Sequence, residues 1–212
     1  KSRRILQRLA RPNERAKDRD RRLANCFGCH NPQPANAQQA ATFYPRDGVS
    51  CEICHGASEQ WIGVHIAADW RVEKQTDHKA WRVRARELGF VDTEDLTVRG
   101  QTCAQCHVGS PGREVNHDLI AAGHPVLKFE LAAYHELLPK HWRGDREREQ
   151  VAAFEVALWS AGQVAAADAA LSLLNWRVGR STMKHPDAAW PELAEYDCFA
   201  CHHDLEDPSW RR

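Results

Sequence analysis

Four copies of one five-residue pattern, Cys-x-x-Cys-His, constrain this chain more than any other feature. The copies span residues 26–30, 51–55, 103–107 and 198–202, named here motifs 1 to 4, and together they use all eight cysteines of the 212 residues. With eight Cys and twelve His in the chain, only about 0.02 copies are expected by chance. The four copies are therefore not accidental, and the pattern must have a chemical role in this chain.

Cys-x-x-Cys-His is the attachment pattern of c-type haem. Two thiols separated by two residues reach the two vinyl groups on one edge of a porphyrin, and the adjacent His ligates the iron. We therefore expect four covalently bound haem c groups. Their thioether bonds are assigned to Cys26, Cys29, Cys51, Cys54, Cys103, Cys106, Cys198 and Cys201. Their proximal iron ligands are assigned to His30, His55, His107 and His202.

Other cysteine chemistries fit the pattern less well. Two Cys₄ zinc sites would not need a His after every second Cys, and the gaps between motifs do not resemble a zinc ribbon. Disulfide scaffolds are typical of shorter chains with irregular cysteine spacing. A thioredoxin-like redox motif would occur once, before a helix of an α/β pattern.

The apolar residues are unusual for a protein core. The chain has one Met and eight Trp, Ile is scarce, and Ala supplies much of the apolar count. Such a chain is short of bulky apolar volume, and large flat cofactors would fill that gap. Together with the absence of a strand-rich region, this predicts an all-α fold with extensive loops in which haems form much of the core.

The predicted elements are mostly helices. We expect a three-haem region over residues 1–140, then a long helix plus a C-terminal haem-binding segment over 141–212, the two forming one compact unit. Helices are predicted at 1–24, with an interruption near Pro12, and at 92–106, with Asp92 as the N-cap. Two more helices are predicted at 145–178, where Gly179 ends the helix, and at 188–200. Residues 31–50 are predicted to form a loop.

Eight histidines outside the motifs are available as second axial ligands. In low-spin haems a second His or Met fills the sixth position of the iron, and Met183 can serve one haem at most. His203 directly follows a proximal ligand, so it would reach a neighbouring iron rather than the same one. The expected distal ligands are His65, His117, His124 and His203, with His78 and His141 as weaker candidates.

The stretch Gly48-Val-Ser-Cys51-Glu-Ile-Cys54-His55-Gly56 closely resembles a segment of the tetrahaem cytochrome c family of ammonia-oxidising bacteria. That family accepts electrons from hydroxylamine oxidoreductase. The resemblance extends over residues 1–130, where motifs 1, 2 and 3 are similar to the family's second, third and fourth motifs. Residues 103–130 are also similar to uncharacterised multihaem cytochromes of environmental bacteria.

The resemblance implies a mainly helical protein with haems stacked in close pairs, one haem being five-coordinate. The family's first motif has no counterpart in this chain, and motif 4 has none in the family. The resemblance therefore also implies a further haem-binding segment upstream of Lys1, whose iron would take one of the histidines named above.

These features predict an electron carrier with closely spaced, mostly bis-His haems, because fully ligated irons leave no site for substrate. The competing function is a redox enzyme that converts nitric oxide, nitrite or hydroxylamine at one five-coordinate haem. A third is a haem-bearing subunit of a larger electron-transfer assembly.

The expected partners are redox proteins, with no nucleic acid. Residues 1–22 carry ten Lys or Arg against three acidic residues, a charge excess that can steer an acidic partner. Haem c attachment takes place outside the cytoplasm, which predicts a periplasmic or extracellular protein. The sequence has no run of 18 apolar residues, so no segment is expected to span a membrane.

Overall fold

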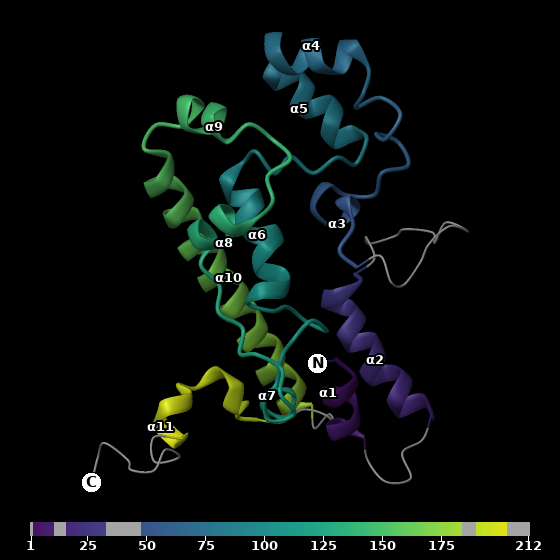
Figure 1. Ribbon diagram of the computed structural model, residues 1–212, viewed down its shortest axis with the longest axis vertical. Helices are drawn as coiled ribbons and strands as arrows, with labels where there is room; N and C mark the ends of the chain where they lie inside the picture. Colours follow the sequence, from purple (N-terminus) through teal and green to yellow (C-terminus); the bar gives the residue numbers. More distant parts are fainter. Residues whose placement is uncertain (1, 11–15, 33–47, 184–189, 203–212) are drawn as a thin grey trace.

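The computed structural model describes residues 2–10, 16–32, 48–183 and 190–202, and these segments contain helices and no β-strand (Figure 1). The prediction of an all-helical fold with long connections is confirmed for them. The helices are α1 (Ser2–Leu9), α2 (Ala16–His30), α3 (Cys51–His55), α4 (Ala68–Thr76), α5 (His78–Glu87), α6 (Leu96–His107), α7 (His117–Ala121), α8 (Leu131–Leu137), α9 (Gly144–Gln150), α10 (Phe154–Thr182), the 3₁₀ turn η1 (Leu193–Glu195) and α11 (Cys198–His202).

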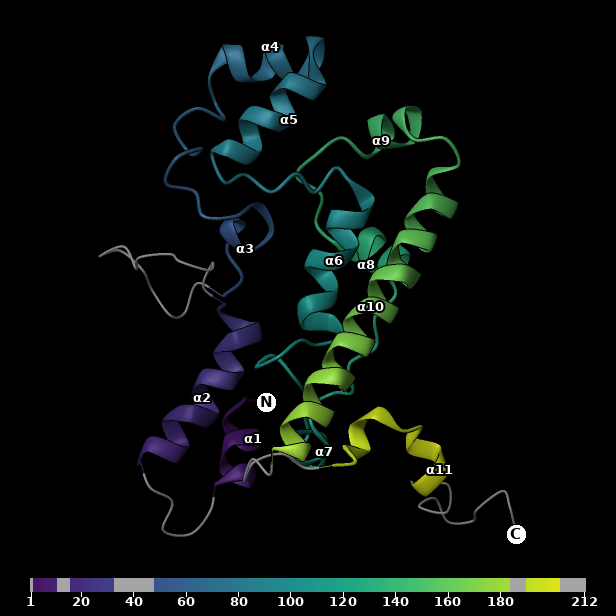
Figure 2. The same cartoon turned by 180° about the vertical axis from the view of Figure 1, so that it is seen from behind.

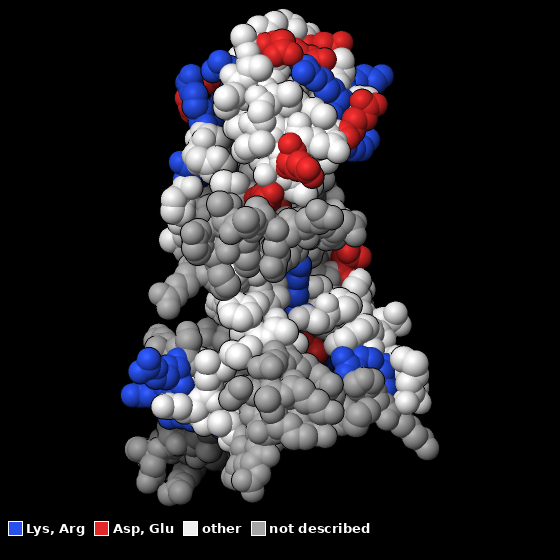
Figure 3. Space-filling model, turned by 90° about the vertical axis from the view of Figure 1, so that its right-hand side faces the viewer, with Lys and Arg blue, Asp and Glu red and all other residues white. Residues whose placement is uncertain are grey.

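The helices form an elongated molecule with two sides. Figures 1 and 2 show α10 running past α6 and α8 along one side, with α2 and α3 on the other. The α4–α5 hairpin lies at one end, and α1, α7 and α11 lie at the opposite end. Charged side chains of both signs gather at the α4–α5 end of the molecule (Figure 3).

The main core is the close contact of α10 with α6 and α8. Leu131, Phe154 and Leu158 are buried there. Two glycines let the helices approach: a Cβ on Gly162 would lie 2.6 Å from the Cβ of Leu131, and one on Gly100 would lie 3.0 Å from the Cβ of Ala165. Bulky residues at these positions would separate the helices, so glycine sets the distance between them.

A second, aromatic core joins α4 to α5. Trp70 and Trp81 are buried against Ala85, and Phe90 packs on them from the following loop. Both tryptophans are therefore core residues of the hairpin. Because this core is separate from that of α10, the hairpin is an additional packed unit at the end of the molecule.

The predicted N-terminal helix and the predicted helix that leads into motif 3 are both present, but they begin or end at other residues than predicted. The interrupted basic helix is present as α1 and α2, but α2 continues through motif 1 to His30. Helix α6 begins at Leu96 and its cap is Asp95, whose side chain accepts hydrogen bonds from the backbone N–H groups of Thr97 and Val98. The prediction of Asp92 as the cap is wrong, because Asp92 instead accepts from the side chain of Arg82, at 2.8 Å.

The predicted long helix is divided. Helix α9 ends at Gln150 and α10 begins at Phe154, and between them Ala153 has the left-handed φ of 49°, which breaks the helical hydrogen-bond series. Helix α10 continues past Gly179 to Thr182. Its 29 residues make it about 44 Å long at the usual helical rise.

The C-terminal region is less helical than predicted. In place of one helix over 188–200, the described residues contain η1 and the five-residue α11. The predicted loop at 31–50 lies mostly outside the described residues, and His203 lies outside them entirely.

Among the described helices, α10 is long and apolar enough to cross a membrane by length and composition alone. Core helices of globular proteins pass the same test. The expectation that no segment spans a membrane therefore remains a prediction.

Candidate haem-binding site

In each motif the two cysteines and the histidine lie on the same side of a helix. All four motifs are helical, at the end of α2 and α6 and throughout α3 and α11. Residues i, i+3 and i+4 share one face of a helix. Both thiols and the imidazole of a motif consequently point in the same direction, as attachment to one porphyrin requires.

Three of the motifs open onto one cavity of about 980 Å³. This volume is at the upper end of the roughly 300–1,000 Å³ typical of ligand pockets. The cavity is lined by residues of α1, α2, α3, α6, α7 and α8. The cysteines and histidines that line it are Cys26, Cys29, His30, Cys54, Cys103, Cys106, His107, His124 and His135. A space of this size lined by thiols and imidazoles fits the chemistry of covalently attached haem.

Cysteines of different motifs contact one another in this cavity. The thiols of Cys29 and Cys106 share a hydrogen bond, which raises the pKa of Cys29 and lowers that of Cys106 to about 6. Burial, with a smaller contribution from nearby Cys54, raises the pKa of Cys103 to about 11. Motif 3 therefore lies near both motif 1 and motif 2.

Three histidine pairs join a motif to a distant part of the chain. The imidazole centroids are 6.2 Å apart for His30 and His124, and 6.0 Å apart for His55 and His141. They are 6.1 Å apart for the third pair, which is His117 and His202. With metal–nitrogen bonds of about 2 Å, two imidazoles on opposite sides of one metal have centroids roughly 6 Å apart. The three separations are those of bis-His ligation.

Backbone carbonyls orient two of these rings. The Nδ1 of His55 lies 3.2 Å from the carbonyl oxygen of Val91, and the Nδ1 of His124 lies 2.8 Å from that of Pro125. An Nδ1–H that donates to a carbonyl leaves Nε2 free to bind metal, which is the usual arrangement of metal-ligating histidines. Burial also lowers the pKa of His55, which favours the neutral ring that a metal needs.

His107 of motif 3 has a different environment. Its ring lies 4.5 Å from that of Tyr134 and 6.3 Å from that of Phe129, centroid to centroid. The hydroxyl of Tyr134 donates a hydrogen bond to the carbonyl of Lys128, at 3.0 Å. Within the part of the chain that the structure describes, aromatic residues rather than a second histidine surround His107.

The expected distal ligands separate into two groups. His117 and His124 each face a proximal ligand, and so does His141, which the sequence favours less strongly. His65 instead lies against Trp61, with ring centroids 5.6 Å apart, and its Nδ1 is 2.6 Å from the carbonyl of Ile62. The structure does not bring His65 into any of the three pairs, and its role as a ligand remains a prediction.

His78, the other weaker candidate, is also outside the pairs. Its ring stacks on Trp81 with centroids 5.3 Å apart, and its Nε2 is 3.7 Å from a carboxylate oxygen of Glu94. The structure does not bring His78 into any of the three pairs, and its role as a ligand remains a prediction.

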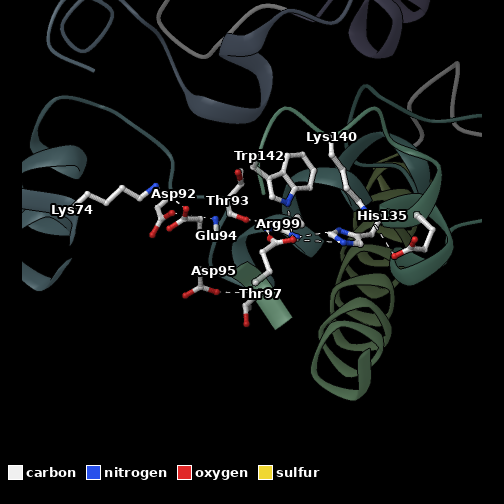
Figure 4. A network of polar contacts seen from close by, with 12 residues as sticks. Lys74, Asp92, Thr93, Glu94, Asp95, Thr97, Arg99, His135, Lys140 and Trp142 are labelled. Carbon is white, nitrogen blue, oxygen red and sulfur yellow. Dashed lines mark hydrogen bonds and ion pairs between the residues drawn. The ribbon is translucent and has the colours of Figure 1, made fainter. Parts of the chain in front are cut away.

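A polar cluster beside motif 3 was missed by the sequence reasoning (Figure 4). Glu147 forms an ion pair with Arg99 of α6 and accepts a 2.6 Å hydrogen bond from the indole N–H of Trp142. Arg99 also lies 3.2 Å from Nδ1 of His135, and burial lowers the pKa of that histidine. The cluster fixes the segment that carries His141. Only the three-dimensional contact identifies it, because its members lie far apart in the sequence.

Glu192 is a second residue that the sequence did not single out. It is buried, and one carboxylate oxygen accepts from the backbone N–H of His117 at 2.8 Å and from that of Ala194 at 3.0 Å. This carboxylate ties the segment before motif 4 to α7. It thereby holds His202 opposite His117, although Cys198 and Cys201 are themselves exposed.

Comparison with known proteins identifies a family resemblance for one part of the chain. Residues 4–56, which include motifs 1 and 2, match the family described as cytochrome c554 and c-prime; the match is shorter than the expected residues 1–130. The comparisons with curated proteins and with solved structures returned no match. Residues 4–56 are thus similar to the cytochrome c554 and c-prime family, whose multihaem c-type cytochromes are typically extracytoplasmic and generally carry electrons.

Proposed function

We propose that this chain is a tetrahaem electron carrier in which at least three haems have bis-His ligation. The three histidine pairs with centroids 6.0–6.2 Å apart carry the proposal. His124 completes the haem of motif 1, His141 that of motif 2 and His117 that of motif 4. A bound haem c supplies an iron that accepts and releases one electron.

The close spacing of the motifs supports a relay through the molecule. Motif 3 adjoins motif 2 through Cys54 and Cys103, and it adjoins motif 1 through Cys29 and Cys106. Motif 1 is linked to motif 4 because their distal ligands, His124 and His117, come from one short segment around α7. These contacts give the spatial series motif 2, motif 3, motif 1, motif 4.

A second function is favoured by the environment of His107. The rings of Tyr134 and Phe129 lie beside His107, whereas the proximal histidine of each other motif has a second histidine 6.0–6.2 Å away. A haem on motif 3 without a second histidine would offer its sixth position to a small ligand such as nitric oxide, and would make the chain an enzyme or a sensor. His203 and His185 lie outside the described residues, so the sequence also offers ligands for this position.

One experiment on the haem-loaded chain tests both functions. Intact mass counts the attached haems, and electron paramagnetic resonance separates low-spin from high-spin iron. Four haems with at least three low-spin signals support the electron carrier. A mass equal to the bare polypeptide, or high-spin signals from most haems, would contradict it. A single high-spin signal that shifts with cyanide or nitric oxide supports a reactive iron at motif 3.

The partners we propose are redox proteins in the periplasm or outside the cell, with the chain acting alone or as a subunit of a larger assembly. Support comes from the basic N-terminal segment. Motif 4 adds to it, because its exposed cysteines bring one haem near the surface.

A further inference from the structure

His135 of α8 is a buried histidine that none of the proposed haem ligations uses. Its side chain is 1% exposed, and it lines the same cavity as the haem-binding residues of motifs 1 to 3. Among the described residues, its ring lies against Trp142 and Phe154, with centroids 5.8 Å and 5.4 Å away, and not against a second histidine. A buried titratable side chain beside a cofactor cavity points to a role in the chemistry of that site.

The two ring nitrogens of His135 have different surroundings. Figure 4 shows the side chain of Arg99 directed at the ring, with Nη1 at 3.2 Å from Nδ1. Because a guanidinium only donates, Nδ1 accepts this hydrogen bond, and the proton of the neutral ring is on Nε2. Nε2 is buried without a hydrogen-bond partner in the part of the chain that the structure describes. A carboxylate oxygen of Glu147 lies 3.7 Å from it, which is too far for a hydrogen bond.

Charged side chains of both signs surround His135. They come from the elements packed around it and are Arg99 of α6, Glu136 of α8, Lys140 of the loop after α8, Glu147 of α9 and Glu155 of α10. The acidic side chains favour a positive charge on the ring, and the basic side chains oppose it. Burial adds to the opposition, so the pKa of His135 lies below its ordinary value. Because these effects partly cancel, an additional charge in the cavity would shift the balance.

An electron on a haem in the cavity is such an additional charge. Helix α6 connects the two sites, because Arg99 lies one helical turn before Cys103 of motif 3. The charge of Arg99 acts to lower the pKa of Cys103, against the larger effect of burial. Cys103 also packs against the apolar cluster that contains Phe154, which the ring of His135 contacts. Charges interact more strongly in such an interior than in water, so reduction favours the protonated ring.

We propose that His135 is a proton-binding site that is coupled to electron transfer through the cavity. The inference rests on the electron carrier proposed above. When a reduced partner protein delivers one electron to the cavity, His135 takes up one proton from water at Nδ1. The hydrogen bond from Arg99 to Nδ1 breaks, and the positive ring pairs with Glu147. Oxidation releases the electron and the proton together, so the charge of the cavity changes little.

The test is the pH dependence of the reduction potentials of the haem-loaded chain, measured by spectroelectrochemical titration between about pH 5 and 8. A proton that binds together with the electron makes reduction easier as the pH falls. This dependence extends from the lowered pKa of His135 in the oxidised chain up to its higher pKa in the reduced chain. His135→Gln has no titrating group at this position, so its potentials should rise less than those of wild type. Axial histidines and haem carboxylates titrate in both proteins and cancel in the difference.

Glu147→Gln is a second variant, and it leaves His135 in place. Its amide oxygen can still accept the hydrogen bond from the indole N–H of Trp142, but the negative charge near Nε2 is lost. The protonated ring is then less stable, so the pH-dependent interval should move to lower pH. An interval that stays at the wild-type pH would contradict the proposed pairing of the protonated ring with Glu147.

His78→Gln is the matched control, because the side chain of His78 is 45% exposed and stacks on Trp81 in the separate core of the α4–α5 hairpin. It should keep the pH dependence of wild type. Unchanged low-spin signals in electron paramagnetic resonance show that each variant retains its haem sites. The proposal is overturned if the potentials of wild type do not depend on pH, if His135→Gln gives a parallel curve, or if His78→Gln reduces the dependence equally. Absence of low-spin haem from wild type would instead overturn the proposed electron carrier.

Discussion

His30 and His124 are far apart in the sequence, yet their ring centroids lie 6.2 Å apart, close to the separation that a shared metal would impose. The same holds for His55 with His141 and for His117 with His202. Each pair joins a motif to a helix or loop that is remote in the chain. Metal ligation and the tertiary fold therefore depend on each other.

The pair of His30 and His124 leads to a direct prediction. His124→Ala should convert one low-spin haem into a high-spin haem that binds added imidazole, while the other low-spin signals stay unchanged. His65→Ala is the control, because His65 packs on Trp61 outside the three pairs. Electron paramagnetic resonance measures both variants, and loss of a low-spin signal in His65→Ala with none in His124→Ala would reverse the assignment.

His135 gives a prediction about pH. Burial disfavours its charged form and holds its pKa below the ordinary 6.5, although Glu147 acts in the opposite direction. As pH falls below about 6.5, the unfolded chain takes up a proton at this position while the folded chain does not, so acid favours unfolding. The contribution of neutral His135 to the free energy of unfolding is fully present at neutral pH. It is lost progressively as the pH falls from about 6.5 to the lowered pKa of the folded state.

The measurement is the melting temperature of the haem-loaded chain between about pH 7.5 and 5. His135→Gln removes the titrating group, so its melting temperature should fall less than that of wild type over this interval. The axial histidines titrate in both proteins and cancel in the difference. Parallel curves for the two proteins would show that His135 does not contribute.

At the scale of elements, the glycines of α10 decide how closely it packs. A Cβ at position 162 would lie 2.6 Å from the Cβ of Leu131, whereas one at position 179 meets no atom within 4 Å. Gly162→Ala should therefore destabilise the protein by about 1–3 kcal/mol through overpacking. Gly179→Ala should be neutral or stabilising by up to about 1 kcal/mol through helix propensity.

Thermal or urea unfolding of the two haem-loaded variants measures this difference. The two substitutions have the same chemistry and lie in the same helix, so only their surroundings differ. Equal stabilities would mean that α10 and α8 do not make the close contact at Gly162.

Local sequence signals predicted the presence of the helices better than the residues at which they begin and end. The four motifs and most of the residues of α10 were predicted from local signals, because haem attachment and helix geometry both act over a few residues. Asp92 and Asp95 carry the same chemical signal for a cap. The choice between them depends on Arg82, which pairs with Asp92 and is brought there by the tertiary fold. The left-handed Ala153 that separates α9 from α10 has no signal in the sequence.

The distal ligands show the limit of sequence reasoning more sharply. His117 and His124 were expected because they closely follow motif 3, and both face a proximal histidine. His141 faces His55 only because the Arg99–Glu147–Trp142 cluster holds its segment beside the cavity. The contact is made by remote residues, so nothing near His141 in the sequence favours it over His65.

At the scale of the whole molecule, motifs 1 to 3 share one cavity and motif 4 stands apart from it. Cys29 of motif 1 and Cys106 of motif 3 share a hydrogen bond, and Cys54 of motif 2 lies near Cys103 of motif 3. Motif 4 is held by Glu192 and by the pairing of His202 with His117. The inner haems would consequently form one cooperative core, and the outer haem would be attached to it.

This difference predicts unequal effects when single haems are removed. Cys198→Ser with Cys201→Ser should yield a chain with three haems and a nearly unchanged melting temperature, because α11 is exposed and contributes little to the core. Cys103→Ser with Cys106→Ser removes the haem between motifs 1 and 2. It should lower the melting temperature strongly and reduce the content of the neighbouring haems, since their packing surface is lost. Haem content per chain and thermal unfolding measure both variants. If removal of the outer haem unfolded the chain as readily as removal of the inner one, the cavity could not be the centre of the fold.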